Sequence, residues 1–174
     1  MLDKLIKKLI QGDTDAFEKL YSLTRKSVYY VALSVLRERS LAEDVMQSTY
    51  IKVIQNASQY KAGTNASAWI ITIAKNEALN IKKRSQRELC VDENDNPTLF
   101  GTSETDDYGL ITDLARKTLP EDEFVILMLI TACGYKRREI SKTLNMPVPT
   151  VTWKYNNALS KMRKQLTDKG GETR

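Results

Sequence analysis

The chain of 174 residues is 41% hydrophobic and 28% charged, and it contains only 7 glycines and 4 prolines. This composition can form a buried core and favours helices, so it excludes a disordered protein and indicates an all-α fold. The chain has no histidine, which removes the Ser-His and Cys-His nucleophile pairs and most zinc sites. We therefore expect a protein that is not an enzyme and has no catalytic residue, metal or cofactor.

The sequence also indicates the compartment. No apolar run approaches the roughly 20 residues of a membrane span, and the N-terminal sequence MLDKLIKKLIQGD alternates charged and apolar residues, unlike a signal peptide. Cys90 and Cys133 show no pairing pattern, which suits a reducing compartment. We expect a cytoplasmic protein without membrane insertion.

Helical periodicity and capping residues predict four helices in the N-terminal part of the chain, at residues 2–11, 14–37, 40–57 and 66–87. Asp13 and Thr14 are the expected caps of the second helix. Ser40 and Glu43 match a capping box that would open the third helix. A turn-rich loop, 59–65, precedes the fourth.

The third helix has two distinct faces. Its buried-looking face consists of Ala42, Val45, Met46, Thr49 and Val53. Its opposite face consists of Asp44, Gln47, Ser48, Ile51 and Gln55. An isoleucine inside a polar stripe suggests a protein contact, and a solvated helix face is the alternative.

The fourth helix is apolar over most of its circumference, which makes its polar residues informative. Lys75 and Lys82 lie seven residues apart on one face. A second edge carries Asn76, Asn80 and Lys83, with Arg84 just beyond.

Residues 90–107 are acidic and show no helical period, so we expect a flexible linker between a domain at 1–89 and a second at 108–174. Residues 1–90 hold 15 Lys/Arg against 9 Asp/Glu, residues 91–125 hold 2 against 10, and residues 126–174 hold 10 against 3. Two basic segments around an acidic one indicate two surfaces for a polyanion. Mixed basic faces that bind no polyanion are the alternative.

The C-terminal part predicts helices at 108–119, 121–133 and 137–144 and a long helix from about 149. Pro120 and the three acids after it suit a helix N-terminus. The last two helices, joined through Asn145 and Pro147, form a helix-turn-helix pattern, in which the second helix enters the major groove. The small core between them would contain Ile140, Leu144, Val148, Val151 and Tyr155.

Trp153 falls on the face of the long helix opposite its apolar residues, close to Asn156 and Asn157. A helix-turn-helix turns this face towards base edges. A purely structural helical hairpin, with Trp153 packed on the linker or on another subunit, is the alternative.

With these features in place, the chain resembles the extracytoplasmic-function sigma factors of bacterial RNA polymerase. The segment GYKRREISKTLNMPVPTVTWKYNNALSKMRKQL is similar to region 4 of that family, which binds the −35 element. Three N-terminal segments are similar to region 2: DAFEKLYSLTRKSVYYVALSVL, LAEDVMQSTYIKVIQ and SAWIITIAKNEALNIKKRSQR. The resemblance implies two all-α domains, a region 2 helical bundle and a region 4 helix-turn-helix.

The resemblance also implies partners and site residues. On the third helix, Asp44 and Gln47, with Ser48 and Ile51 on the same face, would bind the β′ clamp helices of core RNA polymerase, and region 4 would dock on the β flap. The residues expected to hold promoter DNA at the −10 element, where one base is flipped into the loop, are Tyr60, Lys61, Asn65, Lys75, Asn76, Asn80, Lys82, Lys83 and Arg84. Tyr60 would either stack on a base or seal the loop as a buried side chain. An anti-sigma factor is a further implied partner.

The residues expected at the −35 element are Arg137, Arg138, Thr150, Thr152, Trp153, Lys154, Asn156 and Asn157. This chain has PTVTWK at 149–154, where relatives usually have Gly-Thr-Val-Lys-Ser-Arg, and Asn157 replaces a frequent arginine. Asparagine pairs with adenine, and a flat apolar side chain can lie on a thymine methyl. We therefore expect an A/T-containing −35 element, read by Asn156 or Asn157, with Trp153 on a thymine and Lys154 on a phosphate.

Two other functions are compatible with parts of the sequence. A dimeric helix-turn-helix regulator would bind DNA without polymerase, but it has no use for a region 2 pattern. An adaptor that uses its helices only for protein contacts would bind DNA weakly and without sequence preference.

Overall fold

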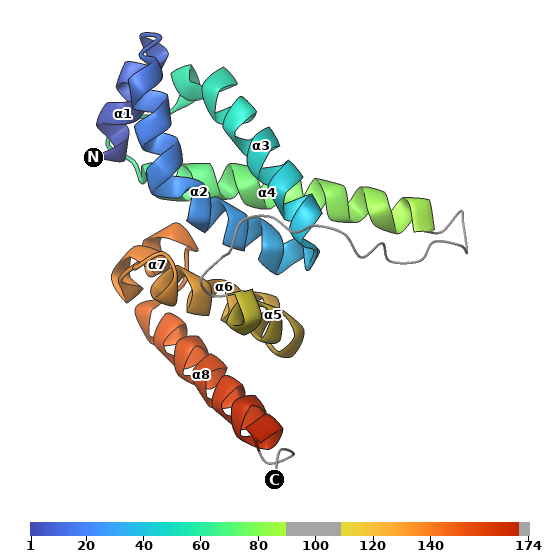
Figure 1. The fold of residues 1–174 in the computed structure, drawn as a ribbon. Coiled ribbons are helices and arrows are strands. Elements are labelled where there is room, and N and C mark those ends of the chain that lie inside the picture. The colour runs from blue at the N-terminus through green and yellow to red at the C-terminus, as the bar shows by residue number, and fades with distance from the viewer. Residues whose placement is uncertain (90–108, 171–174) are drawn as a thin grey trace. The chain divides into compact units, whose positions relative to one another are not determined.

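The computed structural model describes residues 1–89 and 109–170 and divides into two compact units, Met1–Glu104 and Thr105–Arg174 (Figure 1). Within those described ranges all regular structure is helical, which confirms the predicted all-α class. The linker predicted at 90–107 lies outside the described residues.

Residues 1–89, the described part of the N-terminal unit, form four α-helices and one short 3-10 helix. They are α1 (Leu2–Ile10), α2 (Thr14–Leu36), α3 (Arg39–Gln55), η1 (Ala57–Gln59) and α4 (Ala66–Leu89). The long helix α2 packs against α1, α3 and α4, and α3 also packs against α4. The four predicted helices are therefore present, each with bounds close to those expected.

The caps of α2 and α3 differ in how well the sequence predicts them. The Asp13 side chain accepts a hydrogen bond from the Ala16 backbone N–H at 3.0 Å, which confirms Asp13 as the cap of α2, whereas Thr14 is the first residue of the helix. The predicted capping box at Ser40 is wrong, because α3 begins at Arg39 with Glu38 as its N-cap residue. Arg37 ends α2 in a left-handed conformation, with φ 61°, so the chain turns directly into α3 and Ser40 already lies inside the helix.

The core of the N-terminal unit draws on all four helices. Its fully buried side chains include Ile6, Leu20, Val28, Leu33, Val45, Val53 and Ile70. Ala42, Val45, Thr49 and Val53 of α3 are buried as predicted, whereas Met46 is half-buried. A buried hydrogen bond of 2.7 Å joins Thr24 Oγ1 of α2 to the Tyr50 hydroxyl of α3. This core fixes which faces of α3 and α4 remain in solvent.

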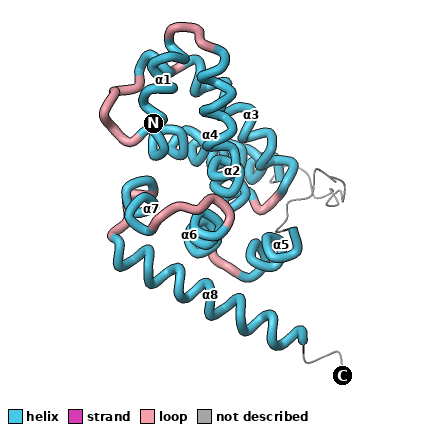
Figure 2. The backbone as a smooth tube through the Cα atoms, turned by 60° about the vertical axis from the view of Figure 1, so that its left-hand side comes forward, coloured by secondary structure: helices cyan, strands magenta, loops and turns pink. Residues whose placement is uncertain are grey.

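The C-terminal unit contains α5 (Gly109–Thr118), α6 (Glu121–Thr131), α7 (Arg137–Thr143) and α8 (Val148–Gly170), seen as a tube in Figure 2. Helix α6 packs against α5, α7 and α8. Every residue from Glu123 to Leu129 is buried, as expected of a helix that is apolar around most of its circumference. Helix α6 is therefore the centre of this unit.

The predicted helix-turn-helix is formed by α7 and α8. Asn145 adopts φ 52°, and the Met146 N–H donates to the Ser141 carbonyl oxygen at 3.0 Å, which closes the turn. Of the five residues expected in the small core, Ile140 and Val151 are fully buried, and Leu144 and Tyr155 are half-buried. Val148 is 37% exposed, so its prediction as a core residue is wrong. It is the first residue of α8 and lies at the edge of the motif.

The turn conformation of Asn145 leads to a stability prediction. Asparagine tolerates the left-handed region, whereas a β-branched residue there is strained. We expect Asn145→Val to lower the free energy of unfolding of the C-terminal unit by about 1–3 kcal/mol. The control Asn145→Gly should change it by less than about 1 kcal/mol. Urea unfolding followed by circular dichroism measures both, and equal stability of the two variants would contradict the assigned turn.

Candidate nucleic-acid and protein-binding surfaces

The exposed face of α3 groups the residues that the sequence predicts for polymerase binding. Asp44 and Gln47 are exposed, Ser48 is half-buried, and Ile51 is 56% exposed. Ile54, which the sequence analysis did not select, is 49% exposed and lies three residues after Ile51, so the two side chains are neighbours on the helix surface. The face therefore combines a carboxylate and an amide with two exposed apolar side chains.

The outer face of α4 is basic. Lys75, Lys82 and Lys83 are exposed, and none of the three forms an ion pair with a described residue. Asn76, Asn80 and Arg84 are exposed as well. Glu77 of this helix faces α3 instead, where its Oε1 is 2.5 Å from Lys52 Nζ. Because that carboxylate is used inside the unit, it does not oppose the positive charge of the outer face.

The loop before α4 is closed by Tyr60. Its side chain is only 8% exposed, and its ring centroid lies 5.2 Å from that of Trp69. Its hydroxyl lies within hydrogen-bonding distance of two acceptors, the Asp3 carboxylate and the Thr64 carbonyl oxygen, the latter 2.9 Å from the hydroxyl oxygen. Of the two predicted roles, Tyr60 therefore has the sealing one in this conformation, and its face is not available for stacking on a base.

The other two predicted DNA-binding residues of this loop, Lys61 and Asn65, are both exposed, but only Asn65 makes a hydrogen bond that caps a helix. Lys61 is exposed. The side-chain oxygen of Asn65 accepts a hydrogen bond of 3.1 Å from the Ala68 N–H, so Asn65 caps α4. Asn65 is nevertheless exposed. An exposed cation and an exposed amide thus flank the sealed Tyr60.

Asp3 is a loop-positioning residue that the sequence analysis missed. It lies in the first turn of α1 and also accepts the Gly63 N–H at 3.4 Å. The hydrogen bond from the Tyr60 hydroxyl lowers the pKa of the Asp3 carboxyl. Burial, and then the hydrogen bond to Asp3, raise the pKa of the Tyr60 hydroxyl. Nothing in the sequence pairs an acid at position 3 with a tyrosine 57 residues later.

The lowered pKa of Asp3 predicts a pH dependence of stability. A carboxyl whose pKa is lower in the folded state stabilises above its unfolded pKa, and the contribution is lost as the pH falls through the folded pKa. We expect wild type to be more stable than Asp3→Asn by a constant margin from neutral pH to about pH 5, and the margin should shrink below about pH 4.

Urea unfolding at several pH values measures that margin. In a Tyr60→Phe background it should be smaller at neutral pH, because the Tyr60 hydroxyl is the largest cause of the pKa shift. A margin that does not change with pH would contradict the assignment.

The outer face of the helix-turn-helix carries Trp153, which is 63% exposed, as predicted. Asn156, Arg137 and Arg138 are also exposed, and Thr150 and Thr152 are half-buried. The Arg137 guanidinium lies over the Tyr155 ring, 5.3 Å from its centroid. An open depression of about 520 Å³ lies between α7 and the start of α8, lined by Arg137, Arg138, Thr152 and Tyr155 among others. A cationic hollow therefore borders the face with the exposed tryptophan.

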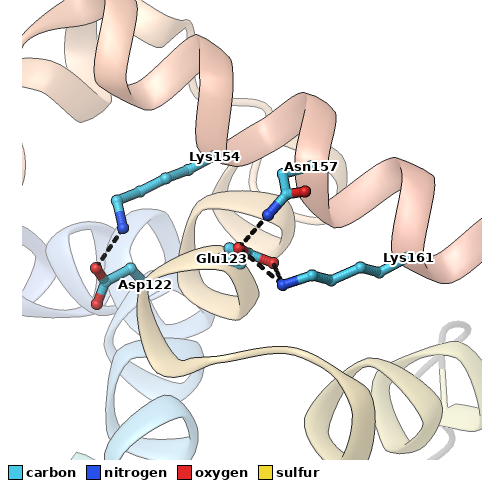
Figure 3. A network of polar contacts seen from close by, with 5 residues as sticks. All are labelled: Asp122, Glu123, Lys154, Asn157 and Lys161. Atoms are coloured by element: carbon cyan, nitrogen blue, oxygen red, sulfur yellow. Dashed lines mark hydrogen bonds and ion pairs between the residues drawn. The ribbon is translucent and has the colours of Figure 1, made fainter.

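Two of the residues predicted to meet DNA are held inside the C-terminal unit (Figure 3). Lys154 Nζ lies 2.7 Å from Asp122 Oδ2, and Asn157 Nδ2 donates to Glu123 Oε1 at 2.6 Å. Lys161 Nζ donates to both oxygens of Glu123, at 3.0 and 2.9 Å. Of the two asparagines considered for base contacts, Asn156 is therefore the one on the open face.

The described parts of the chain contain no group of three His, Cys, Asp or Glu residues placed to hold a metal ion. None of the helices in those ranges has the length and apolar character that crossing a lipid bilayer requires.

Two solved structures share the fold of this chain. The solved structure of CnrH in complex with the cytosolic domain of CnrY shares it with a TM-score of 0.67 at 16% identity, over 95% of this chain and 97% of that one. The sigma factor RpoE of Bartonella quintana, solved with the anti-sigma factor NepR, shares it with a TM-score of 0.63 at 20% identity, over 87% and 96%. The chain therefore has the all-helical fold of a sigma factor.

Sequence comparison gives the family. Residues 20–88 match sigma-70 region 2. The chain is 26% identical to the ECF RNA polymerase sigma factor SigW of Bacillus subtilis, over 97% of this chain and 98% of the relative. It is also 26% identical to the ECF sigma factor SigK of Mycobacterium bovis, over 95% and 93%. The chain belongs to the extracytoplasmic-function (ECF) group of the sigma-70 family.

Proposed function

We propose that this sigma factor directs core RNA polymerase to promoters by dividing the work between its two units. The N-terminal unit binds the polymerase and the melted −10 element, and the C-terminal unit binds the −35 duplex. The observation that carries this proposal is the pair of exposed faces on the N-terminal unit, one on α3 suited to a protein and one on α4 suited to a polyanion. The protein itself performs no chemistry.

Positive charge supports the role of α4 in DNA binding. Lys75, Lys82 and Lys83 form no ion pair with a described residue and lie on an exposed face, where they can neutralise phosphates. Each phosphate neutralised releases counterions and adds salt-dependent affinity. Opening the duplex costs unstacking and unpairing energy, and a loop that captures a flipped base returns part of it. Lys61 and Asn65 are exposed side chains of the loop, and we propose that they meet such a base.

The helix-turn-helix supports the role of the C-terminal unit. A recognition helix lies in the major groove with its N-terminal residues against base edges, and Asn156 and Trp153 are the exposed candidates there. Arg137 and Arg138 lie at the start of α7, where they can contact the phosphate backbone. We therefore propose Asn156 as the residue that selects adenine and Trp153 as the one that contacts a thymine methyl.

The proposed partners follow from the family. Core RNA polymerase would contact α3 through its β′ clamp helices and the C-terminal unit through its β flap. Since the RpoE structure contains an anti-sigma factor, we infer that an anti-sigma protein restrains this chain too. The cytoplasm, where polymerase and promoter DNA meet, is the proposed compartment.

In vitro transcription tests the proposal. Core polymerase should initiate at specific sites in a genomic promoter pool only when this protein is added, and the protein alone should bind the same duplexes poorly. Tight binding of the free protein to a palindromic site as a dimer, with no transcription, would favour the alternative regulator instead.

If α3 binds polymerase, substitutions on its exposed face should lower the affinity for polymerase and leave the protein folded. The double substitution Asp44→Ala with Gln47→Ala removes exposed side chains, so stability should change by less than about 1 kcal/mol. Affinity for core polymerase, measured by fluorescence anisotropy, should fall. The control, Gln11→Ala with Asp15→Ala, removes the same exposed side-chain types elsewhere in the unit and should leave affinity unchanged. Equal affinities of the two variants would remove α3 from the interface.

The role of α8 predicts a change in base selection. Asn156→Ala should flatten the preference at one −35 position, because a bidentate base contact is worth about 1–3 kcal/mol of discrimination. Trp153→Ala should weaken a thymine preference at little cost in folding stability, since Trp153 is 63% exposed. A −35 library selected with each holoenzyme measures both, with Ser160→Ala, also exposed on α8, as the control. Selected sequences identical to those of wild type would exclude both residues from recognition.

A further inference from the structure

Glu123 is a buried carboxylate whose hydrogen bonds come from another helix. It is 5% exposed, lies in the first turn of α6, and accepts three hydrogen bonds from Asn157 and Lys161 of α8 (Figure 3). A buried carboxylate is stable only when it is paired and hydrogen-bonded. Helix α8 must therefore keep these two donors in place whenever the C-terminal unit is folded.

The spacing of the two donors turns this requirement into a geometric constraint. Asn157 and Lys161 are four residues apart, about one helical turn, so both project from the same side of α8. One carboxylate that holds two successive turns fixes both the rotation of α8 about its axis and its position along that axis. Two hydrophobic contacts at these positions would not do so, because apolar packing is not directional.

The constrained side of α8 borders the open face. At about 100° per residue, Asn157 lies roughly 40° from Trp153 around the helix, and Asn156 lies roughly 60° from Trp153 in the other direction. Side-chain tips lie about 5–6 Å from the axis, so a rotation of about 20° displaces them by about 2 Å. A displacement of that size breaks a hydrogen bond whose length must stay near 2.7–3.2 Å.

The neighbouring ion pair does not impose the same constraint. Asp122 is 46% exposed at its side chain, and its partner Lys154 holds it through a single contact of 2.7 Å. Water can replace either partner of such an exposed pair, and a phosphate can replace the carboxylate. The anchor is therefore Glu123, and Asp122 is an exchangeable contact beside it.

We propose that Glu123 is a positioning residue for −35 recognition, which aims Asn156 and Trp153 at the bases by fixing the rotation of α8 through Asn157 and Lys161. This inference rests on the proposed function of the C-terminal unit. It also gives Asn157, which stands where relatives often have an arginine, a role inside the unit in place of a base contact.

The test compares holoenzymes made with wild type and with three variants in a −35 library selection. Glu123→Gln keeps the volume and removes the charge, and Lys161→Met removes one donor while it retains the length of the side chain. Glu121→Gln is the matched control, since it removes a charge from the same first turn of α6 without touching the contacts to α8. Circular dichroism and the salt dependence of non-specific DNA binding are measured in parallel.

We expect Glu123→Gln and Lys161→Met to remain folded and to keep the slope of log affinity against log salt for non-specific DNA. The discrimination at the positions read by Asn156 and Trp153 should fall, for Glu123→Gln by about 5- to 150-fold, the equivalent of one bidentate contact. Glu121→Gln should select the same sequences as wild type.

Two results would overturn the inference. Folded variants that select as sharply as wild type would show that the contacts do not aim α8, and the unfolding of both variants would show that Glu123 serves only the fold. Failure of the proposed function has a different signature, because wild-type holoenzyme would then select no −35 sequence at all.

Discussion

The burial of one carboxylate constrains the whole C-terminal unit. Glu123 lies at the positive end of the α6 dipole, where negative charge is favoured, but it is only 5% exposed, and α8 supplies its three hydrogen bonds. Most of the rest of α6 is apolar and packs against α5, α7 and α8. The same helix therefore contributes both apolar packing, which has no preferred direction, and hydrogen bonds to α8, which do. Burial of the apolar side of α8 holds the unit together, and the carboxylate narrows the rotation that this packing allows. The open face with Trp153 is what remains.

A common arrangement of charge appears in both units. Glu77 forms an ion pair with Lys52, Glu123 forms one with Lys161, and Asp3 accepts a hydrogen bond from the Tyr60 hydroxyl, each within its own unit. These three carboxylates thus make contacts within their own units, whereas Lys75, Lys82 and Lys83 face solvent. A net charge of +5 understates the positive potential that such a distribution presents to a polyanion.

The sequence predicted the helices and their buried faces well, because periodicity reports burial directly. Val45 and Val53 on α3, and the exposure of Trp153 on α8, are examples. It predicted polar partners poorly, because hydrogen bonds between distant residues leave no periodic signal. The pairing of Asn157 with Glu123, 34 residues apart, and of Tyr60 with Asp3 could not be inferred from spacing. The capping box at Ser40 failed for a related reason, since the left-handed Arg37 moved the start of α3.

The link between Asp3 and the loop at Tyr60 has a practical consequence for work with this protein. Helix α1 precedes the stretch that matches sigma-70 region 2, residues 20–88, yet its first turn holds the loop proposed to capture a flipped base. A domain trimmed to residues 20–88 would keep α4 except Leu89 and would lose Asp3, the side chain that accepts the hydrogen bond of the Tyr60 hydroxyl. An affinity tag fused at Met1 would likewise be attached two residues from that contact. Tags on the C-terminal side leave it untouched, so the two ends of this chain are not equivalent sites for engineering.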